Sequence, residues 1–435
     1  MEHPYDIHQL LRDEVIQARE SGIDLTSIEA ELGDITGLSI AEAYALFDRF
    51  AGLPRRADWA YDEPESLAEI LATLPEAAPT VVDAGRLVSQ VNGGWLGRIA
   101  GCNVGKPVED GDRWNRARIK EYLEIAGAYP LRDYVPKLDP MPEGFELKHC
   151  WPTTTLGNVD GSARDDDIDY PILALHLVEK HGDELAREHV GLAWLGLFPF
   201  LRVFTAERAV YANLVSGIPA AQAATTRNPY REWIGALIRG DVYGWINPGN
   251  PRAAAEWAYR DASLSHTANG VYGEMWSAAL VAAAFTATDA EAAIVESLRH
   301  VPPRSRLAEA VESVLAGFRA GLEWEAMLDA IEADYGHYNW VHTVNNAAVI
   351  AAGLLWGRGD YMTAIGLTVQ GGLDTDSNAA TVGSVMGVLL GVEALPAHLV
   401  DPLHDTTRSA LFGFDNSRIS GLAERTLALV RTPVV

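Results

Sequence analysis

Residues 97–109 read GRIAGCNVGKPVE, and glycine recurs in this stretch at every fourth position, at Gly97, Gly101 and Gly105. Four-residue spacing aligns these glycines on one face of a helix, where a neighbouring backbone can approach closely. Each glycine in a helix interior costs about 1 kcal/mol, so three in register require a packing reason. We therefore expect a helix that packs unusually close to a second helix.

The second helix of this pair is predicted near the C-terminal end of the chain. Residues 378–387, NAATVGSVMG, place small residues at the same interval, at Ala379, Gly383 and Gly387. Two such helices can press together through these faces. Their contact would bring Glu109, which ends the first stretch, beside the acidic residues that precede the second.

Those acidic residues lie in residues 370–377, QGGLDTDS, where Asp374 and Asp376 stand two positions apart and Ser377 follows. On a helix, such positions point about 200° apart, so a helical face cannot unite them. On a strand they share a face, but like charges placed there repel each other. The spacing favours a turn in which both carboxylates and the hydroxyl converge on a cation.

Residues 163–171, ARDDDIDYP, form a second acidic stretch that holds Asp165, Asp166, Asp167 and Asp169. Adjacent carboxylates raise one another's pKa and cost stability unless a positive charge neutralises them. Aspartates are also typical of a helix N-terminus, and Pro171 suits a first turn, so an acidic helix start is the alternative. One or two aspartates are enough for that role, and four favour a metal site.

The combined ligand set predicts the kind of metal. Oxygen ligands without a set of cysteines and histidines indicate Mg²⁺ or Mn²⁺, with Ca²⁺ as an alternative, and not zinc. Five or six carboxylates and a hydroxyl exceed what one Mg²⁺ normally takes from protein, so we expect two ions. The sequence contains no P-loop, dinucleotide-binding, GxSxG or HExxH motif.

Composition excludes several other classes of function. The 435 residues carry a formal net charge of −26, which disfavours binding to a phosphate backbone. Only Cys102 and Cys150 occur, which is typical of a reducing compartment. The N-terminus lacks the pattern of a secretory signal, and no apolar stretch is long enough to span a membrane. We expect a cytoplasmic protein that binds neither nucleic acid nor membranes.

The distribution of apolar residues predicts an all-α protein. From about residue 87 onward they recur at intervals of three and four, and alternating strand patterns are scarce. Residues 1–85 are expected to form a helical N-terminal extension, and residues 86–435 the catalytic domain. A loop-rich region at 129–162 interrupts the helices. Loops of this length in compact domains are usually functional or disordered, and the position of this one before an acidic cluster favours a function.

Taken together, the three motifs resemble the ADP-ribosylglycohydrolase family, of the dinitrogenase reductase-activating glycohydrolase type, over residues 87–392. That family has a glycine-every-fourth segment ending in proline-x-glutamate, as at Gly97 to Glu109 here. The DDDI segment at 165–168 is similar to its Thr-Asp-Asp-Thr segment, and residues 372–377 to its Gly-x-Asp-x-Asp-Thr segment.

The resemblance implies a compact orthogonal multi-helix bundle that binds two Mg²⁺ or Mn²⁺ ions. It implies metal ligands at Asp165, Asp166, Asp167, Asp374, Asp376 and Ser377, and catalytic roles for Glu109, Asp166 and Asp376. The implied activity is hydrolysis of an ADP-ribosyl or related ribosyl or glycosyl N- or O-glycosidic bond. Metal-assisted attack of water on an oxocarbenium-like transition state suits such an acidic site.

This chain departs from the family pattern at three places. Asp165 and Ile168 stand where the second motif has threonines, and Cys102 replaces an aspartate. The glycine-asparagine-glycine loop that holds phosphates is absent from residues 225–245. The substrate is therefore expected to be an ADP-ribosylated compound or another small-molecule glycoside.

We expect residues 129–162 and 241–250 to close over the substrate, because aromatic faces stack on planar groups and asparagine reads polar edges. The predicted substrate-binding residues are Glu109, Tyr243, Trp245, Asn247, His266, Asn269 and Gly372. For His266 and His342, a hydrogen-bonded core position is the more common alternative. Arg227, Arg231 and Arg239 either hold a diphosphate or pair with Glu232 and Asp241, and the sequence leaves both alternatives open.

Two rival functions remain at this stage. Asp165, Asp166 and Asp169 also match the DDxxD pattern of Mg²⁺-dependent terpene synthases, with Asn416, Ser420 and Glu424 as a second metal motif. That interpretation leaves the glycine spacing and residues 372–377 unexplained. The other rival is a ligand-binding relative of the family that has lost catalysis.

Overall fold

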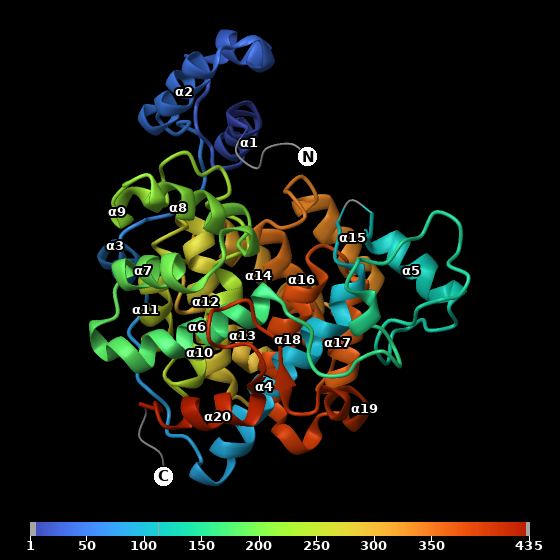
Figure 1. The fold of residues 1–435 in the computed structure, drawn as a ribbon. Helices are drawn as coiled ribbons and strands as arrows, with labels where there is room; N and C mark the ends of the chain where they lie inside the picture. The colour runs from blue at the N-terminus through green and yellow to red at the C-terminus, as the bar shows by residue number, and fades with distance from the viewer. Residues whose placement is uncertain (1–5, 112, 432–435) are drawn as a thin grey trace.

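Helix α4 (Ala84–Gly105) packs lengthwise against α18 (Thr375–Leu390), and this pair lies in the interior of the protein (Figure 1). A Cβ atom added at Gly97 would lie less than 3.0 Å from the carbonyl oxygen of Gly383. Gly101 faces the Ala379 carbonyl in the same way. The helices therefore run antiparallel in register, and the predicted close contact between them is confirmed.

The computed structural model describes residues 6–111 and 113–431. The N-terminal part contains α1 (Ile7–Glu20), α2 (Ile40–Arg49) and α3 (Leu67–Thr73), with 3₁₀ turns η1 (Glu29–Gly37) and η2 (Phe50–Gly52). The middle of the chain contains η3 (Lys106–Val108), α5 (Arg116–Ile125), η4 (Trp151–Thr153), α6 (Asp166–His181), η5 (Gly182–Glu184), α7 (Arg187–Leu197), η6 (Phe200–Arg202), α8 (Thr205–Val215), α9 (Ala220–Ala223), η7 (Leu237–Arg239) and α10 (Asp241–Trp245).

The C-terminal part continues with α11 (Pro251–Ala262), α12 (Ala268–Ala284), α13 (Ala290–Leu298), α14 (Arg306–Arg319), α15 (Trp324–Tyr335), α16 (Thr343–Trp356) and α17 (Tyr361–Gln370). After α18 follow η8 (Val392–Ala394), α19 (Ala397–Val400), η9 (Asp401–Leu403) and α20 (Ile419–Leu427). Strands β1 (Thr406–Thr407) and β2 (Ser417–Arg418) form one short antiparallel pair. The predicted all-α fold class is confirmed.

The core is built around helices that are buried on every side. All residues of α12 and all residues of α16 are buried. Small and apolar residues make up most of both helices, so neither helix has a continuous polar face to turn toward water. Amphipathic helices such as α11 and α14 cover these central helices.

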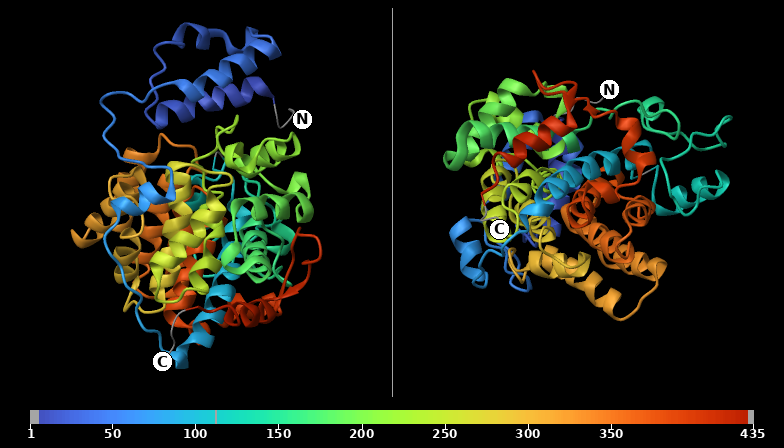
Figure 2. Two further views of the ribbon diagram at one scale, coloured as in Figure 1. Left: turned by 90° about the vertical axis from the view of Figure 1, so that its left-hand side faces the viewer. Right: turned by 90° about the horizontal axis from the view of Figure 1, so that it is seen from below.

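The N-terminal part forms a small unit with its own apolar core, which stands apart from the larger body in Figure 2. Its core side chains are Ile7, Leu10, Leu11, Val15, Ala18, Ile28, Ala43, Leu46, Phe47 and Phe50. Farther along the chain, Ile70 and Val82 belong instead to the main core. The predicted extension thus divides after residue 53 into a small helical unit and a strap along the larger body; residues 1–5 lie outside the described part.

Across residues 6–111 and 113–431, no helix has both the length and the apolarity required to cross a bilayer.

Candidate metal centre

Two helix N-termini point at one acidic cluster. Asp165 is the N-cap of α6, and its side chain accepts a hydrogen bond of 3.0 Å from the backbone amide of Asp167. Asp374 is the N-cap of α18, and Asp376 lies in the first turn of that helix. The positive end of each helix dipole stabilises negative charge there.

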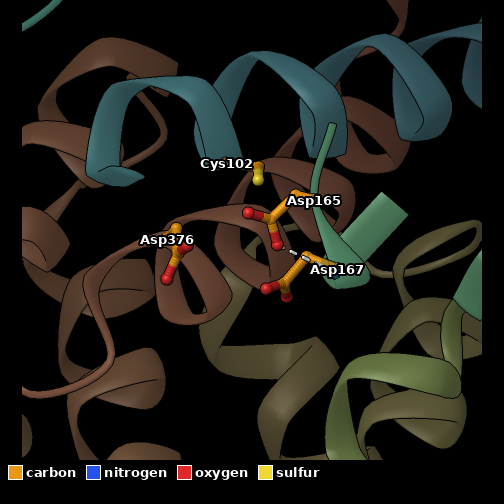
Figure 3. A group of neighbouring side chains, drawn as sticks. All are labelled: Cys102, Asp165, Asp167 and Asp376. Carbon is orange, nitrogen blue, oxygen red and sulfur yellow. Dashed lines mark hydrogen bonds between the residues drawn. The ribbon is translucent and has the colours of Figure 1, made fainter. Parts of the chain in front are cut away.

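The cluster consists of two groups that share Asp376. In the first group, Cys102, Asp165, Asp167 and Asp376 offer ligand atoms within 4.8 Å of one another, and their side chains converge below α4 (Figure 3). In the second, Glu109, Asp374 and Asp376 do the same. The structure thus brings together carboxylates from three separate sequence motifs, and all of these residues are buried except Glu109, which is 18% exposed.

A buried arginine and a serine fix the start of α6 within the cluster. Arg98 donates from Nε to the backbone carbonyl of Asp167 at 2.8 Å and from Nη1 to Asp241 at 2.7 Å. Ser377 Oγ donates to Asp167 Oδ2 at 3.0 Å. These contacts connect α4, α6, α10 and α18 at the point where the acidic side chains meet.

The turn before Asp374 has an uncommon backbone conformation. Gly372 and Leu373 have φ values of +74° and +60°. A leucine in this region costs on the order of 1 kcal/mol, and such strain clusters at functional sites. The side-chain oxygen of Asn346 accepts from the Asp374 amide at 3.2 Å and from Asn378 at 2.7 Å. A residue of α16 therefore fixes the conformation of this turn.

The remaining two aspartates of the DDDID segment are not among the grouped ligand atoms. Asp166 belongs to neither group, and its side chain is 26% exposed with Arg164 Nη1 at 3.9 Å. Asp169 is fully buried and accepts from Ser409 Oγ at 2.6 Å and from Arg164 at 2.7 Å. Asp169 therefore anchors the C-terminal segment rather than the cluster.

Burial and mutual repulsion define the electrostatics of the cluster. Burial, with the nearby Asp376 carboxylate, raises the pKa of Asp167 to about 8. Burial, followed by Asp376 and Asp167, raises the pKa of Asp374 well above its usual range. Oxygen donors that repel one another in this way fit a hard divalent cation, because such a cation would relieve the repulsion.

Two lysines, which the sequence analysis overlooked, enter the cluster. The Lys106 ammonium forms an ion pair with Asp165 and lies 3.8 Å from Asp376 Oδ2, and its side chain is 10% exposed. Lys148, from the loop region at 129–162, pairs with Glu109. Lys106 belongs to the segment GKPVE at residues 105–109, four residues after Cys102. Its position at the end of the predicted helix was the feature of the sequence that could have placed it beside the acidic residues.

Residues 241–249, most of the segment that was expected to close over the substrate, are buried. Tyr243 and Trp245 belong to helix α10 and are fully buried. Tyr243 donates to Asp261 at 2.8 Å, and Trp245 packs on Trp95 with a ring separation of 4.5 Å. Asn247 is also buried and donates to the Tyr243 carbonyl. Their side chains are enclosed in the core, whereas the sequence predicted a segment that closes over the substrate here.

Three further predicted substrate-binding residues have structural partners. His266 is buried with its Nδ1 at 2.8 Å from Ser265 Oγ, and burial lowers its pKa well below the usual range. Asn269 donates to Glu63 at 2.7 Å, within the contact between the strap and the larger body. A Cβ at Gly372 would lie 2.9 Å from the Arg116 amide, so this glycine allows α5 to approach.

His342 matches its expected core position. It is buried, and its Nδ1 accepts from the Val344 amide at 3.2 Å at the start of α16.

The arginines considered as a phosphate grip are engaged elsewhere, and not with the partners expected for them. Arg231 forms two hydrogen bonds of 2.6 and 2.8 Å to Glu14, and Arg227 pairs with Asp48 at 2.8 Å. Both carboxylates belong to the N-terminal unit, so these arginines attach it to the larger body. Arg239 is buried with Glu207 and Asp261, each at 2.7 Å.

The expected partners of these arginines pair with other residues. Glu232 pairs with Arg306 at 2.6 Å, and Asp241 with Arg98.

A cavity of about 510 Å³ lies next to the cluster. Its lining includes Gly111, two residues after Glu109, and Leu373, which precedes Asp374. Arg116 and Glu325, which pair at 2.7 Å, also line it. The second group of carboxylates therefore lies close to a space large enough for a small organic molecule.

Comparison with known proteins identifies the family. A family model described as ADP-ribosylglycohydrolase matches residues 83–433. A solved structure titled "ADP-ribosylglycohydrolase-related protein complex" is 17% identical, with a TM-score of 0.49, and the match covers 80% of this chain and 100% of that chain. No curated protein matches the sequence. The extent of the family match excludes the terpene synthase alternative, and the chain belongs to the ADP-ribosylglycohydrolase family.

Proposed function

We propose that this protein is a metal-dependent glycoside hydrolase that cleaves an ADP-ribosyl or related ribosyl or glycosyl N- or O-glycosidic bond. The observation that carries the proposal is the convergence of Glu109, Asp165, Asp167, Asp374 and Asp376 in one buried cluster. Membership of a glycohydrolase family supports the reaction class. The resemblance at Gly97–Glu109 and Gly372–Ser377 supports the dinitrogenase reductase-activating type.

Mg²⁺ or Mn²⁺ suits these donors, and Ca²⁺ is the alternative. When bound, such an ion supplies a Lewis acid that orients sugar hydroxyls and acidifies water. Glu109, Asp374 and Asp376 are the residues that would hold it. Their attachment to the rigid α4–α18 pair limits their movement during the reaction.

In the reaction, water adds to the anomeric carbon, the glycosidic bond breaks, and the leaving group takes up a proton. Glu109, at the partly exposed edge of the cluster, is suited to accept the proton of the attacking water. Asp376 and the more exposed Asp166 would stabilise positive charge that develops on the sugar ring, as the resemblance to the family implies. The buried surroundings strengthen this electrostatic stabilisation.

We propose a small-molecule glycoside or ADP-ribosylated compound as the substrate. Arg227 and Arg231 are committed to the N-terminal unit and so do not form a diphosphate fork. The same observation favours the second candidate, a relative that binds a ligand without turnover. A cytoplasmic location, with no nucleic-acid or membrane partner, is supported by the two free cysteines and the net charge of −26.

The test is a hydrolysis screen with Mg²⁺, Mn²⁺ or Ca²⁺ over ADP-ribosyl-arginine, ADP-ribosyl-serine, nucleosides and simple glycosides. We expect turnover of at least one class that EDTA abolishes and Asp374→Asn removes. Asp58→Asn, at an exposed position of the strap, is the matched control and should retain activity. Calorimetry with free ADP-ribose reports on the diphosphate: micromolar binding indicates an ADP-ribosyl substrate. Ligand binding without turnover of any substrate indicates the inactive relative.

A further inference from the structure

The two ligand groups of the cluster differ in their donor atoms, and this difference bears on how many ions the proposed enzyme takes. The second group, Glu109, Asp374 and Asp376, offers only carboxylate oxygens. The first group includes the thiol of Cys102, which is a poor ligand for Mg²⁺ or Mn²⁺. The ammonium of Lys106 lies at this first group, where it pairs with Asp165.

Lys106 is fixed in this position by its place in the fold. It follows the last residue of α4, and a Cβ on the preceding Gly105 would collide with the backbone of Thr375. Its carbonyl accepts from the Glu109 amide at 3.4 Å and from Cys150 Sγ at 3.6 Å. The C-terminal end of a helix also favours a positive charge.

Lys148 provides an internal comparison. It also pairs with a carboxylate of the cluster, but it comes from a loop and is 26% exposed, against 10% for Lys106. An exposed lysine on a long flexible stem can turn into solvent at little cost when a stronger cation binds. Lys106 cannot turn into solvent as easily, because its ammonium lies between two buried carboxylates.

We propose that the centre binds a single divalent ion, held by Glu109, Asp374 and Asp376, and that the Lys106 ammonium takes the place of a second ion. This inference rests on the proposed function only in assuming that the cluster binds a metal. It differs from the expectation of two ions. A divalent ion beside Asp165 would stand next to a buried like charge and a neutral thiol, which is unfavourable.

The test counts Mn²⁺ bound per chain by equilibrium dialysis and records the electron paramagnetic resonance spectrum. Wild-type protein is expected to bind one ion and to show an isolated Mn²⁺ signal. Lys106→Gln should bind two ions with the spectrum of an exchange-coupled pair. Lys148→Gln, the matched control, should remain at one, as should Lys106→Arg, which retains the charge.

Two coupled ions in the wild type would overturn this inference while leaving the metal-dependent function intact. A folded Lys106→Gln that still binds one ion would also overturn it. Lys106→Met, with a side chain of similar length, replaces the glutamine variant if circular dichroism shows that the latter is unfolded. Absence of bound Mn²⁺ in every variant would contradict the metal-dependent function itself.

Discussion

Asp374 occupies a buried turn in which its carboxylate faces two others, and the fold supplies little to neutralise it. Burial and the carboxylates of Asp376 and Asp167 raise its pKa. Its amide is satisfied by Asn346, while its side chain makes no capping hydrogen bond to α18. The residue thus contributes less to folding than to the charge of the site.

Asp374→Asn should therefore leave the metal-free protein as stable as the wild type or more stable, because one repelling charge is removed. The same variant should lose the rise in melting temperature that Mn²⁺ gives the wild type. Differential scanning calorimetry with and without Mn²⁺ measures both effects. A variant that Mn²⁺ stabilises as strongly as the wild type would show that Asp374 is not a ligand.

Arg98 has the opposite role, because its charge is needed by the fold. Arg98→Met should lower the free energy of unfolding by about 3–5 kcal/mol, since it leaves Asp241 buried without its ion pair. Urea unfolding of the variant measures this loss. Arg113→Met, at an exposed position, should change stability by less than about 0.5 kcal/mol. Equal effects for both variants would contradict the assigned role of Arg98.

At the scale of elements, the α4–α18 pair depends on backbone contact rather than on side-chain interdigitation. Gly97→Ala should destabilise the protein by about 1–3 kcal/mol or more, because its Cβ meets the backbone of Gly383. Gly196→Ala, on an exposed part of α7 with open space around it, should be neutral or stabilising by up to about 1 kcal/mol. Thermal unfolding compares the two, and tolerance of alanine at both positions would exclude a tight contact.

The pairing of these two helices could be predicted because close packing against a second helix is the simplest explanation of glycine at four-residue intervals. The burial of residues 241–245 could not be predicted in the same way. A short segment with glycine, tyrosine and tryptophan reads equally as an exposed turn or as a buried helix. The packing of Trp245 on Trp95 decides that this segment is a buried helix, and it brings together segments about 150 positions apart.

The candidate site shows the same limit. Its acidic members could be recognised from their density, whereas the pairing of Lys106 with Asp165 depends on how the end of α4 meets the start of α6. Arg227 and Arg231 were natural choices for a phosphate grip by charge alone. Their partners, Asp48 and Glu14, lie in the N-terminal unit. The sequence around the two arginines contains no pattern that predicts where this unit binds.

At the scale of the whole molecule, Glu20 of the N-terminal unit is largely buried near Glu232 and Arg306 of the larger body. Burial, with the Glu232 carboxylate, raises the pKa of Glu20 to about 7. Because the folded-state pKa lies above the unfolded value, its contribution is fully present below the unfolded pKa and is lost as pH rises through about 7.

Glu20→Gln should consequently be more stable than the wild type at pH 8.5, by on the order of 1 kcal/mol after solvent screening, and equal to it near pH 4. Melting temperatures at both pH values test this sign. Glu29→Gln, an exposed position in the same unit, should leave the pH dependence unchanged. A stability difference that grows toward low pH would contradict the assignment.

The contact between the ends of α4 and α18 also sets when the acidic cluster can form during synthesis. The Thr375 hydroxyl donates to the Gly105 carbonyl across 270 positions of sequence. A ribosome that adds roughly 5–20 residues per second needs tens of seconds to cover that distance. Throughout this interval the glycine face of α4 has no partner, and neither Asp374 nor Asp376 exists. Any nascent chain shorter than about 376 residues therefore lacks the centre, so the acidic cluster is assembled only after most of the chain has been made.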